Sequence, residues 1–393
     1  MSPTPVTMAD PTTPSAYSWE ATDEQVSARY GVPLEQIARF DLNTTVAPPE
    51  FALELLTTGA YGRAISEYPP SDYRALAVAA AEAYGVEPDE ILVGAGADEI
   101  LDLLAKAFLP PGAGAVVPVP TYAMYSVLTE QRPARVLRVP RMPATNGYAL
   151  DLPATRAAAS EAAVVWLCSP NNPTALAEPA GTVAALLADL AGDAAADGRT
   201  PPLVVIDEAY AEFAGGTLLP LRHAYPRLVV VRTASKAYAL AGLRVGFAIA
   251  RPEIIVEVAP YRPPGSVSIP SVAVVTAALR RPDALAANIA RITAERARLA
   301  EGFGAAGFPT GPSVTNFLLV NFGSPTRAGA VADALLRRGL VPRTFGAGHP
   351  FAGHPLAGHL RFTVRSTDQN DRLLAAIGEI AAAGAPASTE SPA

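Results

Sequence analysis

The chain of 393 residues contains a single cysteine, Cys168. One cysteine cannot form an internal disulfide, and it excludes metal sites that are built from several cysteine ligands. Because Cys168 ends the apolar run at 164–168, we interpret it as a small core residue rather than a nucleophile. A reduced, cytoplasmic setting is therefore the expectation for this protein.

Long apolar runs are also missing. No run reaches the roughly 18–20 residues of a membrane-spanning helix, and the N-terminus lacks the basic region and apolar core of a signal peptide. Basic residues are outnumbered, with 30 Lys and Arg against 37 Asp and Glu and a net charge of −7. Because a nucleic-acid-binding protein presents a basic face, we expect neither nucleic-acid nor membrane partners.

Lysine is scarce even among the basic residues, since the 30 include only Lys106 and Lys236. Lys106 lies in an apolar helical pattern, whereas Lys236 follows the apolar run at 228–231, which is typical of a buried strand. Unlike arginine, lysine can lose its proton and attack a carbonyl group as an amine. We therefore interpret Lys236 as a residue that forms a Schiff base with an aldehyde cofactor.

Strand and helix patterns alternate along much of the chain. The expected strands lie at 91–93, 115–119, 136–139, 163–168, 203–206, 228–231 and 245–250, and the expected helices at 72–84, 97–108, 121–130 and 183–190. Such alternation predicts an α/β fold, in which a mostly parallel sheet is covered by helices on both faces.

The pattern changes after residue 270. A helical stretch at 272–305, interrupted near Pro282, precedes strands at 317–322 and 360–364 and a helix at 327–338. This pattern predicts a smaller α+β domain. The expected organisation is an N-terminal arm at 1–39, partly disordered, a large domain at 40–270, a small domain at 271–383 and a disordered tail at 384–393.

Several polar groups fall where strands end, which is where ligands gather in open parallel sheets. Gly-Ala-Gly at 94–96 opens a helix, and it is either a phosphate site or a tight strand–helix turn. Asn-Asn-Pro at 171–173 is either a turn or a means of presenting Asn172 to a ligand. Ser235 and Arg244 can both reach an anion near Lys236.

Asp207 directly follows the apolar strand at 203–206. Burying a carboxylate without a partner costs free energy, so Asp207 needs a partner. A Walker B aspartate would require a Gly-x-x-x-x-Gly-Lys-Ser/Thr loop, which the chain lacks. The other interpretation is an ion pair with a protonated ring nitrogen. A phosphate cradle, a ring-nitrogen partner, a hydrogen-bonding amide and a Schiff-base lysine together form the inventory of a pyridoxal phosphate site.

Several blocks resemble the fold-type I, class I/II aminotransferases and are most similar to the histidinol-phosphate aminotransferase family. They are Gly-Ala-Asp-Glu at 96–99, Pro-Thr-Tyr-Ala-Met-Tyr at 120–125, Cys-Ser-Pro-Asn-Asn-Pro-Thr at 168–174, Asp-Glu-Ala-Tyr at 207–210, Arg-Thr-Ala-Ser-Lys-Ala-Tyr-Ala-Leu-Ala-Gly-Leu-Arg at 232–244 and Leu-Arg-Phe-Thr-Val at 360–364. The resemblance implies a mostly parallel seven-stranded sheet between helices, a smaller C-terminal α+β domain, and pyridoxal 5′-phosphate as the cofactor.

The resemblance also implies catalytic and ring-binding roles. Lys236 resembles the lysine that holds the cofactor and then moves a proton between the substrate carbon and the cofactor. Asp207 resembles the partner of the pyridinium nitrogen, which keeps the ring protonated. Tyr210 and Asn172 resemble the pair that hydrogen-bonds the ring oxygen, and Tyr122 resembles the aromatic residue that stacks on the ring.

The cofactor phosphate has a matching set as well. The backbone amides of Ala97 and Asp98, together with Ser235 and Arg244, resemble the phosphate-binding group of the family. Tyr68, in Glu-Tyr-Pro, resembles the tyrosine that reaches the phosphate of the other subunit. This last match implies a homodimer.

On the substrate side, Arg361 resembles the arginine that holds the α-carboxylate through a bidentate pair, and Asn172 is matched as a substrate contact. Arg343 aligns with a second arginine that contacts a substrate side-chain phosphate. The implied reaction moves an amino group between a small-molecule donor, histidinol phosphate or an aromatic amino acid, and a 2-oxo acid such as 2-oxoglutarate. The alternative is a decarboxylase or a specialised biosynthetic aminotransferase on the same scaffold. A non-enzymatic, cofactor-dependent regulator is disfavoured, because no DNA-binding domain is recognisable.

Three positions depart from the family pattern. Ala175 stands where the family has the glycine of Asn-Pro-Thr-Gly, the segment at 42–48 replaces an Asn-Glu-Asn-Pro entry, and Glu67 replaces an arginine before Tyr68. The last two lie near the expected substrate entrance, so they bear on the substrate more than on the cofactor.

Three of the four histidines, His349, His354 and His359, recur every five residues among Gly and Pro. This spacing does not place them on one helix face, and no carboxylate cluster adjoins them. We therefore expect no metal site.

Overall fold

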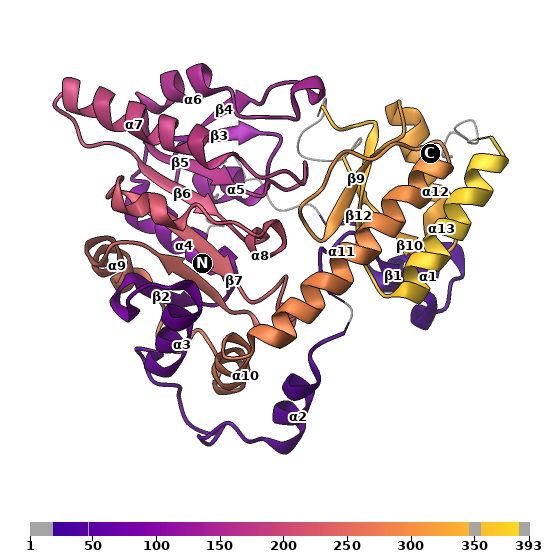
Figure 1. Cartoon of the computed structure of the whole chain (residues 1–393), viewed down its shortest axis with the longest axis horizontal. Helices are drawn as coiled ribbons and strands as arrows, with labels where there is room; N and C mark the ends of the chain where they lie inside the picture. Colours follow the sequence, from indigo (N-terminus) through magenta and orange to yellow (C-terminus); the bar gives the residue numbers. More distant parts are fainter. Residues whose placement is uncertain (1–18, 46, 346–354, 385–393) are drawn as a thin grey trace, which may run out of the picture.

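The computed structural model describes residues 19–45, 47–345 and 355–384. It has a large sheet covered by helices on both faces and a smaller group of strands and helices beside it (Figure 1). The large sheet has the strand order β2-β8-β7-β6-β5-β3-β4. Its strands are β2 (Ile91–Gly94), β3 (Gly114–Val119), β4 (Arg135–Pro140), β5 (Ala162–Cys168), β6 (Leu203–Asp207), β7 (Leu228–Thr233) and β8 (Gly246–Ile249).

Only β8 runs against the others, because it pairs antiparallel with both β2 and β7. The predicted mostly parallel, seven-stranded α/β fold is therefore confirmed. Each predicted strand of this sheet begins and ends within two residues of the observed one.

The central strands are apolar along their whole length because both faces of the sheet are covered. Val165 and Ile206 face one core, which includes side chains of α3 (Arg74–Tyr84), α6 (Leu152–Ala159), α7 (Ala180–Ala196) and α10 (Ile269–Leu279). Trp166 and Val205, one residue away, face the other core with α4 (Gly96–Phe108), α5 (Met124–Gln131) and α9 (Pro252–Val258). This alternation leaves polar residues only where the strands end.

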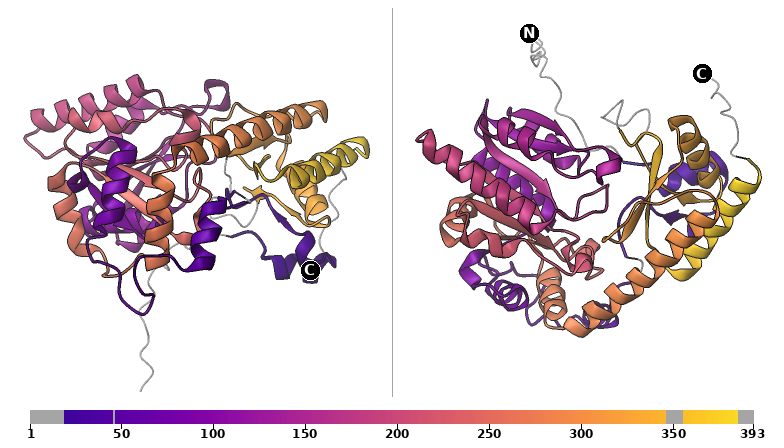
Figure 2. Two further views of the ribbon diagram at one scale, coloured as in Figure 1. Left: turned by 60° about the horizontal axis from the view of Figure 1, so that its bottom comes forward. Right: turned by 45° about the horizontal axis from the view of Figure 1, so that its top comes forward.

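The smaller layer is built on an antiparallel sheet in the order β11-β12-β9. Its strands are β9 (Phe317–Asn321), β11 (Arg343–Thr344) and β12 (His359–Thr363), and its helices are α11 (Pro282–Ala305), α12 (Pro325–Leu336) and α13 (Thr367–Ala382). Aromatic side chains fill the core between them, with the rings of Phe303 and Phe362 centred 4.9 Å apart. The long helix α11 runs from the large sheet to this layer (Figure 2).

The segment that contains α1 (Asp23–Tyr30) and β1 (Ala38–Arg39) packs on the smaller layer. α1 begins with a capping box between Thr22 and Gln25, and the Tyr30 hydroxyl donates a 2.7 Å hydrogen bond to Asp333. β1 then pairs in parallel with β10 (Leu340–Val341). This pairing fixes the path of the chain into the space between the two layers.

Two features bear on the expected domain limits. The boundary at residue 270 falls inside α10, which packs against α3 and α2 (Glu50–Thr58) and whose side chains belong to the core of the large sheet. Pro282 separates α10 from α11, as expected for a residue without an amide hydrogen at the start of a helix. The division of the chain at residues 40 and 270 stays a prediction.

The helix predicted at 121–130 begins only at Met124. Thr121 and Tyr122 lie in the loop between β3 and α5, and the Thr121 hydroxyl donates to the Asn171 side chain over 2.7 Å. Throughout the described ranges, every helix is too short or too polar to cross a bilayer.

Candidate active site

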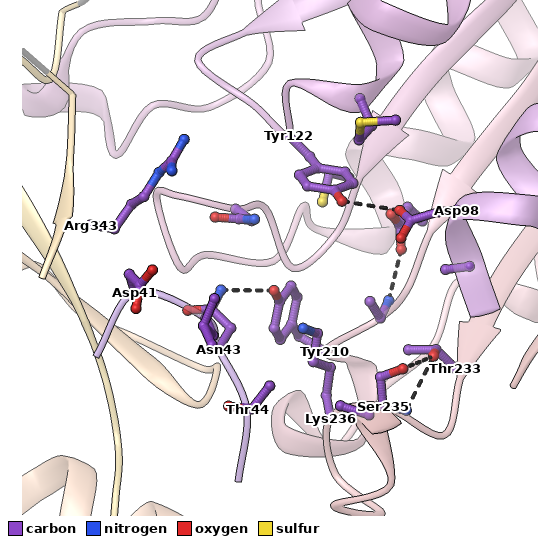
Figure 3. Close-up of a pocket in the computed structure, with 18 of the residues that line it drawn as sticks. Asp41, Asn43, Thr44, Asp98, Tyr122, Tyr210, Thr233, Ser235, Lys236 and Arg343 are labelled. Atoms are coloured by element: carbon purple, nitrogen blue, oxygen red, sulfur yellow. Dashed lines mark hydrogen bonds between the residues drawn. The ribbon is translucent and has the colours of Figure 1, made fainter. Parts of the chain in front are cut away.

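A cavity of about 630 Å³ lies where β5, β6 and β7 end and the smaller sheet begins (Figure 3). The residues predicted to bind the cofactor and the substrate line it, with the exception of Tyr68. They are Ala97, Asp98, Tyr122, Asn172, Asp207, Tyr210, Ser235, Lys236, Arg244, Arg343 and Arg361. Residues more than 260 positions apart in the sequence therefore meet in one space.

Asp207 is buried at the last position of β6, so its carboxylate points out of the carboxyl end of the sheet. The Tyr125 hydroxyl donates to it over 2.9 Å, and the Ala209 amide donates over 3.0 Å. Burial raises the pKa of Asp207 to about 6, although both hydrogen bonds act in the opposite direction. Within the described ranges, no Lys, Arg or His forms an ion pair with this carboxylate.

Lys236 follows β7, is half-buried and lines the cavity. Burial lowers the pKa of its amine to about 8, and the nearby charge of Arg361 lowers it further, while Asp98 and Asp207 act in the opposite direction. Its Nζ lies 5.8 Å from the centre of the Tyr210 ring. A larger fraction of this lysine is therefore unprotonated near neutral pH than of an exposed lysine, as a nucleophilic amine requires.

The N-terminus of α4 directs free backbone amides into the cavity, and Arg244 lies beside it. The Arg244 guanidinium is 3.2 Å from the Asp98 carboxylate, which also accepts a hydrogen bond of 3.0 Å from the Tyr122 hydroxyl. On the other side, the Ser235 hydroxyl accepts a 2.9 Å hydrogen bond from Thr233. Amides, a hydroxyl and a guanidinium thus converge as an anion site would require.

Glycines allow this close approach. A Cβ on Gly96 would lie 2.6 Å from Arg244 Nη2, and Gly96 has a φ of +84°. A Cβ on Gly246, in β8, would lie 2.4 Å from the Gly96 carbonyl carbon and 2.6 Å from the Ala97 nitrogen. The backbone of β8 therefore supports the first turn of α4 directly.

Arg361 joins the two layers. It is buried on β12, and its Nη1 donates to Asn172 Oδ1 over 2.5 Å, while its Nη2 donates to the Asp41 carbonyl. Arg343 on β11 lies directly opposite Arg361 in the antiparallel pair. Both arginines line the cavity, so its far end is lined by two guanidinium groups.

Two residues that contact the predicted site residues were not recognised from the sequence. Asn43 is buried with a φ of +54°, and its Nδ2 donates to the Tyr210 hydroxyl over 2.9 Å (Figure 3). Glu20 lies 3.7 Å from Arg343 Nη1. The departure noted at 42–48 was the signal for Asn43, but nothing local marked Glu20, which falls in the segment expected to be an arm.

The remaining departures have local explanations. Ala175 is buried and adopts a φ of +67°, the left-handed conformation that glycine adopts more easily, while its amide donates to the Asn171 carbonyl. Glu67 forms an exposed ion pair with Arg63. Tyr68 is 87% exposed and lies outside the cavity of its own chain.

Cys168, at the end of β5, is buried and borders the cavity. Burial raises the pKa of the Cys168 thiol to about 12, so it stays protonated, which agrees with the predicted core role. His349 and His354 lie outside the described residues, and burial lowers the pKa of His359. In the parts of the chain that the structure describes, no group of three His, Cys, Asp or Glu side chains could hold a metal ion.

Comparison with known proteins gives consistent matches. The family model described as "Aminotransferase class I and II" matches residues 40–377. A histidinol-phosphate aminotransferase of Roseiflexus castenholzii is 35% identical over 366 residues, which cover 91% of this chain and 93% of that protein. One from Symbiobacterium thermophilum is 39% identical over 325 residues, which cover 80% and 84%.

A solved structure matches as well. The histidinol-phosphate aminotransferase of Sinorhizobium meliloti, in complex with pyridoxal-5′-phosphate, superposes with a TM-score of 0.81 at 27% identity. The match covers 93% of this chain and 96% of that chain.

The support of α4 by β8 leads to a first prediction. Gly246→Ala should displace the Ala97 amide and weaken binding of pyridoxal 5′-phosphate by about tenfold or more, at a cost in stability of about 1–3 kcal/mol. Gly242→Ala is the matched control, because its Cβ would meet no atom within 4 Å. Titration with the cofactor and thermal unfolding measure the two effects. Equal cofactor affinity in the two variants would show that β8 does not shape the phosphate site.

Proposed function

The chain belongs to the class I and II aminotransferases, and we propose that it uses pyridoxal 5′-phosphate, held on Lys236, to move an amino group between small molecules. The observation that carries this proposal is the meeting of Lys236, Asp207 and Arg361 in one buried cavity. An amine, a ring-nitrogen partner and a carboxylate-binding guanidinium are the three groups that the reaction needs on the protein.

The residues around the cavity fit the cofactor. Asp207 is a buried carboxylate without an ion-pair partner among the described residues, which suits a protonated ring nitrogen. The amides at the start of α4, together with Ser235 and Arg244, suit a phosphate. Tyr122 would cover the ring, and Asn172 and Tyr210 would hydrogen-bond its oxygen.

When bound, the cofactor supplies an aldehyde that accepts the amino group and a ring that accepts electrons from the substrate carbon. Lys236 would take the proton from that carbon at Nζ and pass it to the cofactor carbon that carries the aldehyde, and in the second half of the reaction it would move a proton in the reverse direction. A pKa of about 8 suits both directions, because the amine can gain and lose a proton near neutral pH. Asp207 would hold the ring nitrogen in its protonated form throughout.

For the donor, we propose histidinol phosphate or an aromatic amino acid, with a 2-oxo acid such as 2-oxoglutarate as acceptor. Arg361 would hold the carboxylate of an amino or oxo acid through two parallel hydrogen bonds, with Asn172 beside it. Arg343, opposite Arg361, would bind a second anionic group such as a phosphate. The names of the relatives support the phosphorylated donor, and no observation favours decarboxylation.

We further propose a homodimer in which Tyr68 reaches the phosphate site of the partner. Large apolar side chains are exposed along α2 and the loop that follows it, which is unusual for a surface that faces water. They are Leu53, Leu56, Ile65 and Tyr68. A second copy covering this surface would bury them and would bring a tyrosine to each site.

The two lysines give a direct test of cofactor attachment. Pyridoxal 5′-phosphate should give the protein an absorbance band at the edge of the visible range, and Lys236→Ala should abolish it, because the amine in the cavity is the attachment point. Lys106→Ala should keep the band, since Lys106 lies on the surface of α4 in an ion pair with Asp102. Absorbance spectra of dialysed protein make the comparison. Loss of the band in the Lys106 variant, or its survival in the Lys236 variant, would exclude the assignment.

The lowered pKa of Lys236 predicts how attachment depends on pH. Only the unprotonated amine attacks an aldehyde, and its pKa is about 8 instead of 10.5. The rate of cofactor capture by the Lys106→Ala protein should therefore rise with pH up to about 8 and then level off. Stopped-flow absorbance over a pH series measures it. A rate that keeps rising to the range of an exposed lysine would contradict the shift.

A donor screen tests the reaction itself. Histidinol phosphate, phenylalanine, tyrosine, tryptophan and basic amino acids are offered with 2-oxoglutarate, and glutamate formation is measured. Asp207→Asn should lower kcat by about a hundredfold or more, because the ring nitrogen loses its anionic partner, whereas Asn172→Ala should cost about tenfold. Release of carbon dioxide in place of a keto product would instead identify a decarboxylase.

A further inference from the structure

The segment of residues 19–22 lies at the substrate end of the cavity. Trp19 lines the cavity, although 70% of its surface is exposed. Glu20 is only partly exposed, and its Oε1 accepts hydrogen bonds from the Thr344 amide over 2.7 Å and from the Thr344 hydroxyl over 2.9 Å. The same oxygen lies 3.7 Å from Arg343 Nη1.

These contacts place a carboxylate of the protein at a guanidinium that faces the cavity. Arg343 is buried, so its charge is poorly screened by water and attracts an anion strongly. Glu20 supplies that anion from the chain itself. A phosphate or carboxylate at the far end of a substrate would compete with Glu20 for the same guanidinium.

The contacts of Glu20 can be broken without unfolding the segment behind it. Arg39 donates to the Ala21 carbonyl over 2.5 Å and pairs with Asp23 over 3.1 Å and with Asp41 over 2.5 Å. The capping box at Thr22 then starts α1. Residues from Ala21 onward are therefore held independently of Glu20, and of the residues that the structure describes only Trp19 and Glu20 have to move.

We propose that Glu20 is a specificity-determining residue. Its carboxylate neutralises Arg343 while the substrate end of the cavity holds a donor with an uncharged side chain. A donor with a second anionic group uses Arg343 only by displacing Glu20 together with Trp19. Glu20 thus favours donors with uncharged side chains over donors that carry a distal phosphate or carboxylate. This inference rests on the proposed aminotransferase function and refines its substrate class.

Glu20→Gln is the sharpest test, because glutamine keeps an oxygen for both Thr344 hydrogen bonds and removes only the charge. In the cofactor-loaded protein, the variant should raise kcat/KM for histidinol phosphate about threefold to tenfold. The value for phenylalanine should stay within about twofold. Glu24→Gln is the matched control, because it removes an exposed carboxylate of the same region that does not line the cavity. Equal changes for both donors, or equal effects of the two variants, would overturn the proposal.

Trp19 provides a second readout that does not depend on turnover. The chain has only two tryptophans, and Trp166 is buried against Tyr125, so the emission lost in Trp19→Phe belongs to Trp19. Histidinol phosphate should change this emission, whereas histidinol should not, and Glu20→Gln should lower the concentration of histidinol phosphate required. An identical response to both ligands would overturn the displacement. A protein that transfers no amino group would refute the proposed function, while this titration would still decide the role of Glu20.

Discussion

The burial of Asp207 and Lys236 at the ends of adjacent parallel strands is the constraint on which the site depends. Burial disfavours the charged form of each group, so it raises the pKa of the carboxyl to about 6 and lowers that of the amine to about 8. The two values move toward each other and toward neutral pH. The sheet produces this effect because β6 and β7 are covered on both faces and carry polar side chains only at their ends.

The smaller layer completes the site from the other side. Arg361 donates to Asn172 on the loop after β5 and to the carbonyl of Asp41, which precedes α2 in the chain. Three distant segments therefore converge on one guanidinium. Its position depends on the pairing of β12 with β9 and β11, and that pairing depends on the aromatic core around Phe362. The arginine that we propose to bind the substrate carboxylate is thus held by the packing of a whole layer.

The meeting of the proposed cofactor-binding residues in one cavity was largely predictable from the sequence, because several of them follow apolar strands within a few positions. Lys236, Asp207 and Asn172 each stand just past a run that could be recognised locally, and parallel pairing brings such ends together. Tyr68 was placed by resemblance, and within one chain it faces solvent. Helix α2 was not singled out, because it follows Pro48 and Pro49 and begins without a side-chain cap. Helix α13 was also missed, although Ser366 and Gln369 mark its N-terminus and the Ser366 side chain caps it.

The contacts of Asn43 and Glu20 could not be predicted in the same way. Both depend on the pairing of β1 with β10, which joins residues about 300 positions apart. Strands of two residues leave no recognisable pattern in the sequence, so this pairing could not be predicted. The residues that we propose for the chemistry thus lie in local sequence motifs, whereas those that we propose for substrate binding are brought together by long-range packing. A change at Glu20 leaves β5, β6 and β7 untouched, whereas a change at Asn43 would also remove the hydrogen bond to Tyr210. The fold therefore allows the substrate preference to vary while the positions of Lys236 and Asp207 stay fixed.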